Sequence, residues 1–212
     1  MRFEKCRLLF GDDFEKITKA KIILFGVGGV GSFCLDALYR SGVKNITIVD
    51  FDTYELTNQN RQIGSQYLGE TKTEALAKLY PGINYITLKV TTKWIKEFDF
   101  EKYDLVIDAI DDIPVKVALA KKTYKKLVSS CGGAKRINPT LIEIASIWKT
   151  TNDPFAKKFR YELKKSDFKE DFQVVFSKEL PKKCDGMGSF VGVTGSMGLA
   201  LSSLALQKLR YL

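Results

Sequence analysis

The chain has 212 residues, of which 45% are hydrophobic and 28% charged, a balance typical of a soluble globular protein that can bury a core without disulfides. It has four cysteines without a CxxC pair and no histidine, so a zinc site is not expected and the thiols indicate a reducing cytoplasm. The net charge is +9, and residues 116–183 carry 17 Lys/Arg against 7 Asp/Glu, which fits either a nucleic-acid partner or a merely solvated surface.

The first elements in chain order form a βαβ unit. Residues 20–25 (AKIILF) predict a buried strand, residues 30–39 a helix after a glycine turn, and residues 45–50 (NITIVD) a second strand. Residues 51–66 are polar and predict mostly loop. A helix over 71–79 and a strand over 84–88 are expected next.

The remaining chain continues this alternation. We expect strands over 103–108, 127–130 and 141–148, and helices over 114–125 and 153–165, the second capped by Asp153. Residues 167–183 are charged and predict a partly mobile segment. Residues 186–207 carry no charge but are too rich in Gly, Ser and Thr for a membrane span, which favours a buried C-terminal helix. The pattern predicts an α/β, Rossmann-like fold, a mostly parallel sheet with helices on both faces.

Residues 26–31 (GVGGVG) match the GxGxxG pattern between a predicted strand and a predicted helix. Glycines here let phosphates approach the backbone, and the free N–H groups of the following helix attract an anion. Asp50 ends the next strand, where a carboxylate can accept hydrogen bonds from a ribose. These features fit NAD as well as ATP, and a glycine turn that serves only packing stays open.

A polar cluster favours ATP over NAD. Asn58 and Arg61 lie in TNQNRQ, and Lys72 lies in GETK. Hydride transfer gives no reason for two cations beside the phosphate loop, whereas attack on an α-phosphate does, because the leaving pyrophosphate develops negative charge. Asp108 and Asp111, in VIDAIDD, end a further strand where a carboxylate could hold Mg²⁺.

These motifs carry a family resemblance. The run GVGGVGS…ITIVDFDTYELTNQNRQ…GETK…VIDAIDD resembles the ubiquitin-activating-enzyme-like superfamily, which includes the adenylyltransferases of thiamine and molybdopterin synthesis. RQIGSQYLGETK, SSCGGAKRINPT and DPFAKKFRYELKK are similar, within it, to the bacterial tRNA threonylcarbamoyladenosine dehydratases, from about residue 2 to the C-terminus. The paired zinc cysteines usual in sulfur-carrier adenylyltransferases are missing.

The resemblance implies a role for each matching position. A phosphate loop would be formed by Gly26, Gly28, Gly29 and Gly31, a ribose contact by Asp50, phosphate contacts by Asn58, Arg61 and Lys72, and a Mg²⁺ ligand by Asp111, with Arg61, Lys72 and Asp111 as the catalytic set. The resemblance also implies ATP and Mg²⁺ as cofactors. It further implies one adenylation domain over 1–212, with a nucleotide-binding core over about 1–135 and the basic helix, mobile loop and C-terminal helix over about 136–212.

The resemblance implies a reaction and partners as well. The carboxylate of threonylcarbamoyladenosine in tRNA would be adenylated, and ring closure would follow with net loss of water. The resemblance also implies a homodimer, and relatives often have an N-terminal arginine that reaches across the dimer to the partner's ATP. Here Lys5 stands at that position, with Arg2 and Arg7 nearby, and a lysine lacks the bidentate fork of arginine.

The basic segment then has a candidate use. Binding of tRNA phosphates is expected at Lys157, Lys158, Arg160, Lys164 and Lys165. Tyr161 and Phe159 could each stack on a base or belong to the core, and we favour the core for Phe159. A thioester role for Cys131 or Cys184 is conceivable, but an ordinary thiol is favoured for both. Two other functions stay open: an adenylyltransferase for the C-terminal glycine of a ubiquitin-like sulfur carrier, and a non-catalytic nucleotide- or tRNA-binding module.

Overall fold

The computed structural model describes residues 2–210, which contain a seven-stranded sheet in the order β3-β2-β1-β4-β5-β7-β6. The strands are β1 (Ile22–Phe25), β2 (Ile46–Asp50), β3 (Asn84–Thr87), β4 (Leu105–Asp108), β5 (Leu127–Ser130), β6 (Ile142–Ser146) and β7 (Gln173–Ser177). All neighbouring strands run parallel except β6, which lies antiparallel to β7 at one edge. The predicted Rossmann-like α/β fold is confirmed.

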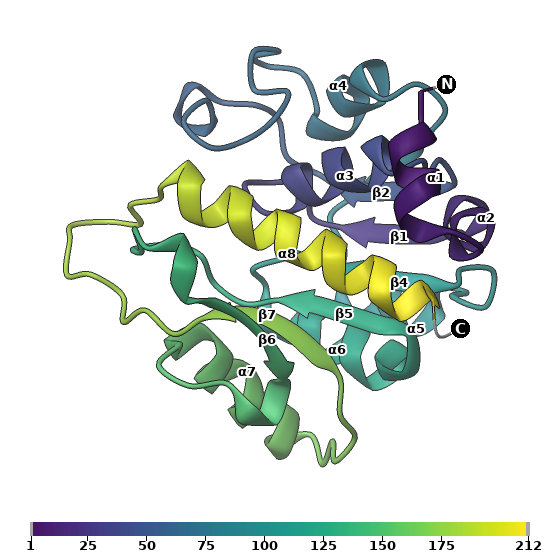
Figure 1. The fold of residues 1–212 in the computed structure, drawn as a ribbon. Helices are drawn as coiled ribbons and strands as arrows, with labels where there is room; N and C mark the ends of the chain where they lie inside the picture. The colour runs from purple at the N-terminus through teal and green to yellow at the C-terminus, as the bar shows by residue number, and fades with distance from the viewer. Residues whose placement is uncertain (1, 211–212) are drawn as a thin grey trace.

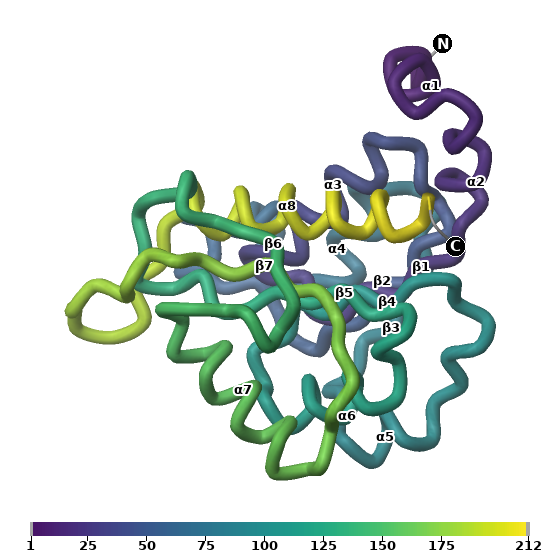
Figure 2. The backbone as a smooth tube through the Cα atoms, turned by 60° about the horizontal axis from the view of Figure 1, so that its bottom comes forward, coloured from purple at the N-terminus to yellow at the C-terminus, as the bar shows by residue number. Residues whose placement is uncertain are grey.

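Helices cover both faces of this sheet (Figures 1 and 2). They are α1 (Glu4–Phe10), α2 (Asp13–Lys19), α3 (Gly31–Arg40), α4 (Lys72–Leu79), α5 (Thr92–Glu97), α6 (Ile113–Thr123), α7 (Pro154–Lys165) and α8 (Val191–Arg210). One hydrophobic cluster joins the sheet to α2, α3, α4 and α8, and a second joins its other face to α5, α6 and α7. Because both faces are covered, β1, β4 and β5 are buried along their whole length.

Helix α8 accounts for the uncharged C-terminal stretch. It packs across the sheet beside α3, and Gly198 lies so close to the start of α3 that a Cβ there would overlap the carbonyl oxygen of Val30. The glycines therefore serve close helix packing. Among residues 2–210, no helix combines the length and apolar character needed to cross a bilayer.

Helix α7 begins as its sequence predicts. The Asp153 carboxylate accepts a hydrogen bond from the Ala156 backbone N–H at 3.0 Å, and Pro154 occupies the first turn, where no backbone donor is needed. Phe159 and Leu163 turn inward and are fully buried, which confirms the expected core position of Phe159.

The segment expected to be partly mobile, 167–183, contains β7, a strand that the sequence analysis did not predict. Val174, Val175 and Phe176 are fully buried, and β7 pairs with β5 on one side and β6 on the other. Charged residues flank this short apolar run on both sides, so the sequence analysis did not predict a strand there. The short helices α1, α2 and α5 were not anticipated either.

Candidate nucleotide-binding site

A cleft of about 560 Å³ opens at the carboxyl ends of the parallel strands. It lies beside β1, which has β2 on one side and β4 on the other, so the order of the strands along the chain reverses there. Doubly wound sheets bind their ligands at such a reversal. Of the predicted nucleotide-site residues, eight line this cleft: Gly26, Gly28, Gly29, Asp50, Asn58, Arg61, Lys72 and Asp111. The structure therefore brings together side chains from four separate segments of the chain.

Gly31 is the predicted phosphate-loop residue that does not line the cleft. A Cβ at Gly31 would overlap the carbonyl oxygen of Gly26, so this glycine lets the start of α3 fold tightly against the end of β1. Above the loop, the nearest atom to a Cβ built on Gly28 lies 3.8 Å away. Val30, which precedes α3, makes no side-chain cap, so the first-turn N–H groups have no side-chain acceptor there. A loop backbone without side chains and a helix start that no side chain caps together fit a phosphate group.

Asp50 is fixed by backbone donors on both of its carboxylate oxygens. One oxygen accepts from the Val27 N–H at 2.8 Å, within the glycine loop, and the other from the Asp52 N–H at 2.9 Å. Each carboxylate oxygen has a second lone pair. Asp50 therefore orders the loop while keeping capacity for a ribose hydroxyl.

Lys72 begins α4 and is only 5% exposed. Its Nζ pairs with the Asp52 carboxylate at 2.8 Å, and Thr71 caps the same helix from the preceding position. A lysine ammonium has three protons, so the Asp52 contact leaves two. The buried position restricts the ammonium to the cleft.

Arg61 and Asn58 lie on the polar segment between β2 and α4. Nη1 of Arg61 donates to the Thr57 carbonyl and to the Asn60 side-chain oxygen, both at 2.8 Å. The Asn58 side-chain oxygen accepts from the Glu55 N–H at 3.1 Å, which leaves its amide nitrogen as a donor. Both residues are thus oriented by local hydrogen bonds before any ligand arrives.

The two acidic residues after β4 have different environments. Asp111 is exposed in the cleft, where a carboxylate can share Mg²⁺ with phosphate oxygens. Asp108 is fully buried and pairs with the equally buried Lys116 at 2.7 Å. The suggestion that Asp108 could hold Mg²⁺ is therefore wrong, because its charge is already matched inside the protein.

Lys116 was missed as a site-supporting residue. Its ammonium donates to the carbonyls of Ile110, at 3.1 Å, and Ser130, at 2.9 Å, two residues that line the cleft. Asp108 in turn accepts from the Ser129 hydroxyl at 2.7 Å. A signal existed in the sequence, since Lys116 occupies the apolar face of α6 with Ile113 and Ala120.

The wall of the cleft opposite Asp50 is formed where the motifs SSCGGAKRINPT and DPFAKKFRYELKK meet. Arg136, from SSCGGAKRINPT, donates to the Gly132 carbonyl and pairs at 3.3 Å with Asp153, the cap of α7. Both charged residues are buried, and burial raises the pKa of Asp153 while Arg136 opposes that rise. Phe155 and Thr194 complete this wall, and sequence analysis assigned a role to neither.

The two candidate thiols differ in position. Cys131 lines the cleft but is 5% exposed, and burial raises the pKa of its thiol well above the usual range. A protonated thiol is a weak nucleophile, which favours the ordinary-thiol interpretation. Cys184 is exposed and lies outside this cleft.

The basic helix α7 presents most of its predicted phosphate contacts to solvent. Lys157, Lys158, Lys164 and Lys165 are exposed. Arg160 is half-buried and donates to the Thr150 hydroxyl, so it also anchors the helix. Nearby, Tyr161 is 63% exposed, which rules out the core for this residue.

The N-terminal cations lie on or beside α1. Arg2 stacks over the Phe3 and Tyr39 rings, and Arg7 over the Phe14 ring. Lys5 is exposed. None of the three lines the cleft of its own chain.

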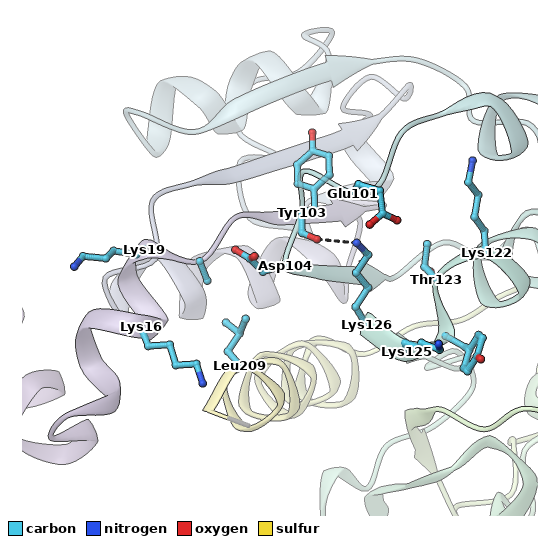
Figure 3. A pocket seen from close by; sticks show the side chains of 12 residues that line it. Lys16, Lys19, Glu101, Tyr103, Asp104, Lys122, Thr123, Lys125, Lys126 and Leu209 are labelled. Atoms are coloured by element: carbon cyan, nitrogen blue, oxygen red, sulfur yellow. Dashed lines mark hydrogen bonds between the residues drawn. The ribbon is translucent and has the colours of Figure 1, made fainter. Parts of the chain in front are cut away.

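A larger hollow of about 1020 Å³ lies at the amino ends of the strands (Figure 3). Five lysines contribute to its lining, and Lys126 donates to the Tyr103 carbonyl at 3.0 Å. It has no glycine loop and lies at the sheet edge opposite the strand carboxyl ends. We therefore assign the nucleotide to the smaller cleft, where the oriented donors converge.

Comparison with known proteins identifies the family of the chain. The model of the ThiF family matches residues 4–209. The tRNA threonylcarbamoyladenosine dehydratase of Bacillus subtilis is 38% identical over 192 residues, 85% of this chain and 76% of that protein. The crystal structure of Escherichia coli tRNA N6-threonylcarbamoyladenosine dehydratase, TcdA, in complex with ATP superimposes with a TM-score of 0.91 at 32% identity, covering 98% of this chain and 93% of that one. HcgE of Methanothermobacter marburgensis, with a TM-score of 0.69 and 16% identity over 91% of this chain and 96% of its own, shares the fold. The chain therefore belongs to the ThiF family and is similar within it to the tRNA threonylcarbamoyladenosine dehydratases.

Proposed function

We propose that this chain is an ATP-dependent tRNA threonylcarbamoyladenosine dehydratase, acting as one adenylation domain in the cytoplasm. The observation that carries the proposal is the meeting of Arg61 and Lys72 with the glycine loop and Asp50 in one cleft. The similarity to the Escherichia coli enzyme, solved with ATP and with AMP, supports the nucleotide and the substrate.

The proposed reaction has two steps. The free carboxylate of the modified adenosine attacks the α-phosphorus of ATP, the bond to the bridging oxygen breaks, and pyrophosphate leaves with that electron pair. A nitrogen of the same modification then attacks the activated carbonyl carbon, loses its proton, and AMP leaves. Arg61 and Lys72 stabilise charge on the departing pyrophosphate. The second step is intramolecular, so positioning supplies much of its acceleration.

One assay tests the proposal directly. The protein is incubated with ATP, Mg²⁺ and tRNA bearing threonylcarbamoyladenosine. The tRNA is then digested to nucleosides, whose masses are measured by mass spectrometry. We expect the modified nucleoside to lose the mass of one water, with AMP and pyrophosphate released in equal amounts. A nucleoside of unchanged mass excludes the dehydratase. Pyrophosphate exchange that requires a carrier ending in Gly-Gly instead would identify a sulfur-carrier adenylyltransferase, and ATP binding without turnover would identify a binding module.

We expect Asp111→Asn to raise the Mg²⁺ concentration needed for half-maximal activity. Mg²⁺ takes one or two protein carboxylates together with phosphate oxygens. Asp111 and Asp112 are both exposed in the cleft after β4, and we assign the metal to Asp111 because Asp112 caps α6. The increase should be at least about 10-fold, because metal affinity falls by about that factor even when only a residue hydrogen-bonded to a metal ligand is removed. Magnesium titrations at saturating ATP measure it.

Asp112→Asn is the matched control for that variant. Asp112 caps α6 by accepting from the Val115 N–H at 3.0 Å, and asparagine caps a helix as well as aspartate does. Its Mg²⁺ dependence should equal that of the parent. Equal dependence in Asp111→Asn as well would remove Asp111 from the metal site.

We propose that α7 binds the tRNA backbone through Lys157, Lys158, Lys164 and Lys165. Replacing the four by glutamine should flatten the plot of log affinity for tRNA against log salt by about 2.8 to 3.6, the loss of four phosphate contacts. Binding isotherms at several salt concentrations measure the slope.

A second set of variants tests the effect of removing three lysines outside α7. Lys16, Lys19 and Lys125 line the hollow at the amino ends of the strands, so their replacement lowers the net charge without touching α7. We expect their salt slope to match the parent. If the salt slope decreased in these variants but not in the α7 variant, the tRNA site would instead be the hollow at the amino ends of the strands.

We also propose that the protein is a homodimer. Leu8 and Leu9 of α1 are 72% and 78% exposed, and α1 buries none of its own residues. Figure 2 shows this helix projecting from the body of the molecule. Light scattering should give twice the chain mass for the parent and the chain mass for Leu8→Glu/Leu9→Glu. A parent that stays monomeric at assay concentration refutes the dimer.

A further inference from the structure

The cleft has two halves with different chemistry. Asp50, Arg61 and Lys72 occupy the half beside β1 and β2, where the nucleotide is assigned. The other half is built from residues that follow β5 and from the first turn of α7, and its lining includes Gly132 and Phe155. Thr194 of α8 lies against both Gly29 and Gly133, at the boundary between the two halves. The carboxylate of the substrate must reach the α-phosphate from within the same cleft. Because ATP is assigned to the first half, we assign the substrate to the second half.

Phe155 is the aromatic ring of that second half. It is half-buried, in contrast to Phe159 one turn later, which is fully buried. Strands β1 and β4 separate β2 from β5, so Asp50 and the residues after β5 are about 14 Å apart at the usual spacing of strands. The ring therefore lies away from the ribose position of the nucleotide.

Three contacts fix the position of this ring. Gly132 packs against it so closely that a Cβ on Gly132 would be 3.1 Å from the Phe155 Cβ. The buried ammonium of Lys116 lies 5.6 Å from the ring centroid. The pair of Arg136 and Asp153 holds the start of α7 to the same wall at 3.3 Å. A rigid, partly exposed ring is what a stacking surface requires, because little entropy is lost when a ligand covers it.

We propose that Phe155 is the platform on which the adenine of the modified nucleotide stacks, while Lys157 and Lys158, two and three residues further along α7, bind the flanking phosphates. Proteins that recognise single-stranded RNA loops combine base stacking on aromatic side chains with cationic contacts to the backbone. Both lysines are exposed, and α7 carries them and Phe155 on one short rigid element. This inference rests on the proposed function and assigns the substrate half of its site.

Steady-state kinetics with modified tRNA test the inference. Phe155→Leu keeps an apolar side chain but removes the ring, and its kcat/KM for tRNA should fall about 5- to 150-fold, the usual loss for one base–aromatic stack. The KM for ATP should stay at the parental value. Phe155→Tyr, which keeps the ring, should restore the kcat/KM for tRNA. Parental melting temperatures in both variants exclude a folding defect as the cause.

Tyr161→Leu tests the other exposed ring of α7, for which base stacking was also considered, and Tyr161 does not line the cleft. It should keep the parental kcat/KM for tRNA. A parental value in Phe155→Leu, a loss in Tyr161→Leu alone, or a raised KM for ATP in Phe155→Leu would each overturn the stacking role. If the parent enzyme itself leaves the tRNA unchanged, the proposed function fails, and that result is distinct from an active parent with an unaffected Phe155 variant.

Discussion

Lys72→Met should lower kcat by about 10² to 10³, the effect of removing one fixed donor to developing charge, while the fold survives. The ammonium is held at the cleft by burial and by its 2.8 Å contact with Asp52. The side chain of Asp52 is 47% exposed and can be hydrated once its partner is gone. The melting temperature should therefore stay within about 4 °C of the parent, as for the loss of about 1 kcal/mol in a chain of this size. Single-turnover kinetics and thermal melts measure the two effects separately.

Lys78→Met is the control because it removes an ion pair from the same helix outside the cleft. Lys78 pairs with Glu70 at 2.6 Å and lies outside the cleft. We expect parental kcat with a similarly small change in melting temperature. If Lys72→Met kept parental kcat, or lost activity only in proportion to folded protein, Lys72 would be a structural residue and the phosphate assignment would fail.

The nucleotide half of the site was predictable because its information is local. The apolar run of β1, the glycine turn and the start of α3 follow each other directly, and Asp50 ends the next strand. Parallel strands bring such residues to one sheet edge without further knowledge of packing. That the polar segment between β2 and α4 has a fixed conformation was not predictable. This conformation depends on the buried Tyr54, whose hydroxyl donates to the Ile63 carbonyl at 2.5 Å.

The substrate half was not predictable because its contacts are long-range. In the chain, β6 and a short 3-10 turn on each side of it separate Arg136 from Asp153. The sequence marked Asp153 as a helix cap but gave no sign that Arg136 is its partner. The excess of basic residues over 116–183 was interpreted as surface, yet Lys116 and Arg136 are buried and paired. Net charge counts residues without regard to burial, so it overstates the surface available to a polyanion.

Lys116→Met should cost about 3–5 kcal/mol of stability, the usual penalty for leaving one member of a buried ion pair without its partner. The carboxylate of Asp108 is fully buried, so water cannot replace the lost ammonium. The carbonyls of Ile110 and Ser130 lose a donor at the same time. Chemical denaturation measures the change, and Lys121→Met, on the exposed face of the same helix, should stay within about 0.5 kcal/mol of the parent.

The double variant Asp108→Asn/Lys116→Met separates the charge from the packing. Asparagine keeps an acceptor for the Ile110 N–H, which Asp108 binds at 3.1 Å, but has no charge to strand inside the protein. We expect the double variant to be more stable than Lys116→Met alone, with a coupling energy in the range of about 0.5–3 kcal/mol found for contacting residues. Additive costs would mean that the two charges do not depend on each other. A recovered fold with weakened ATP binding would show instead that the pair, beyond balancing its own charges, holds the ends of β4 and β5 at the spacing the cleft needs.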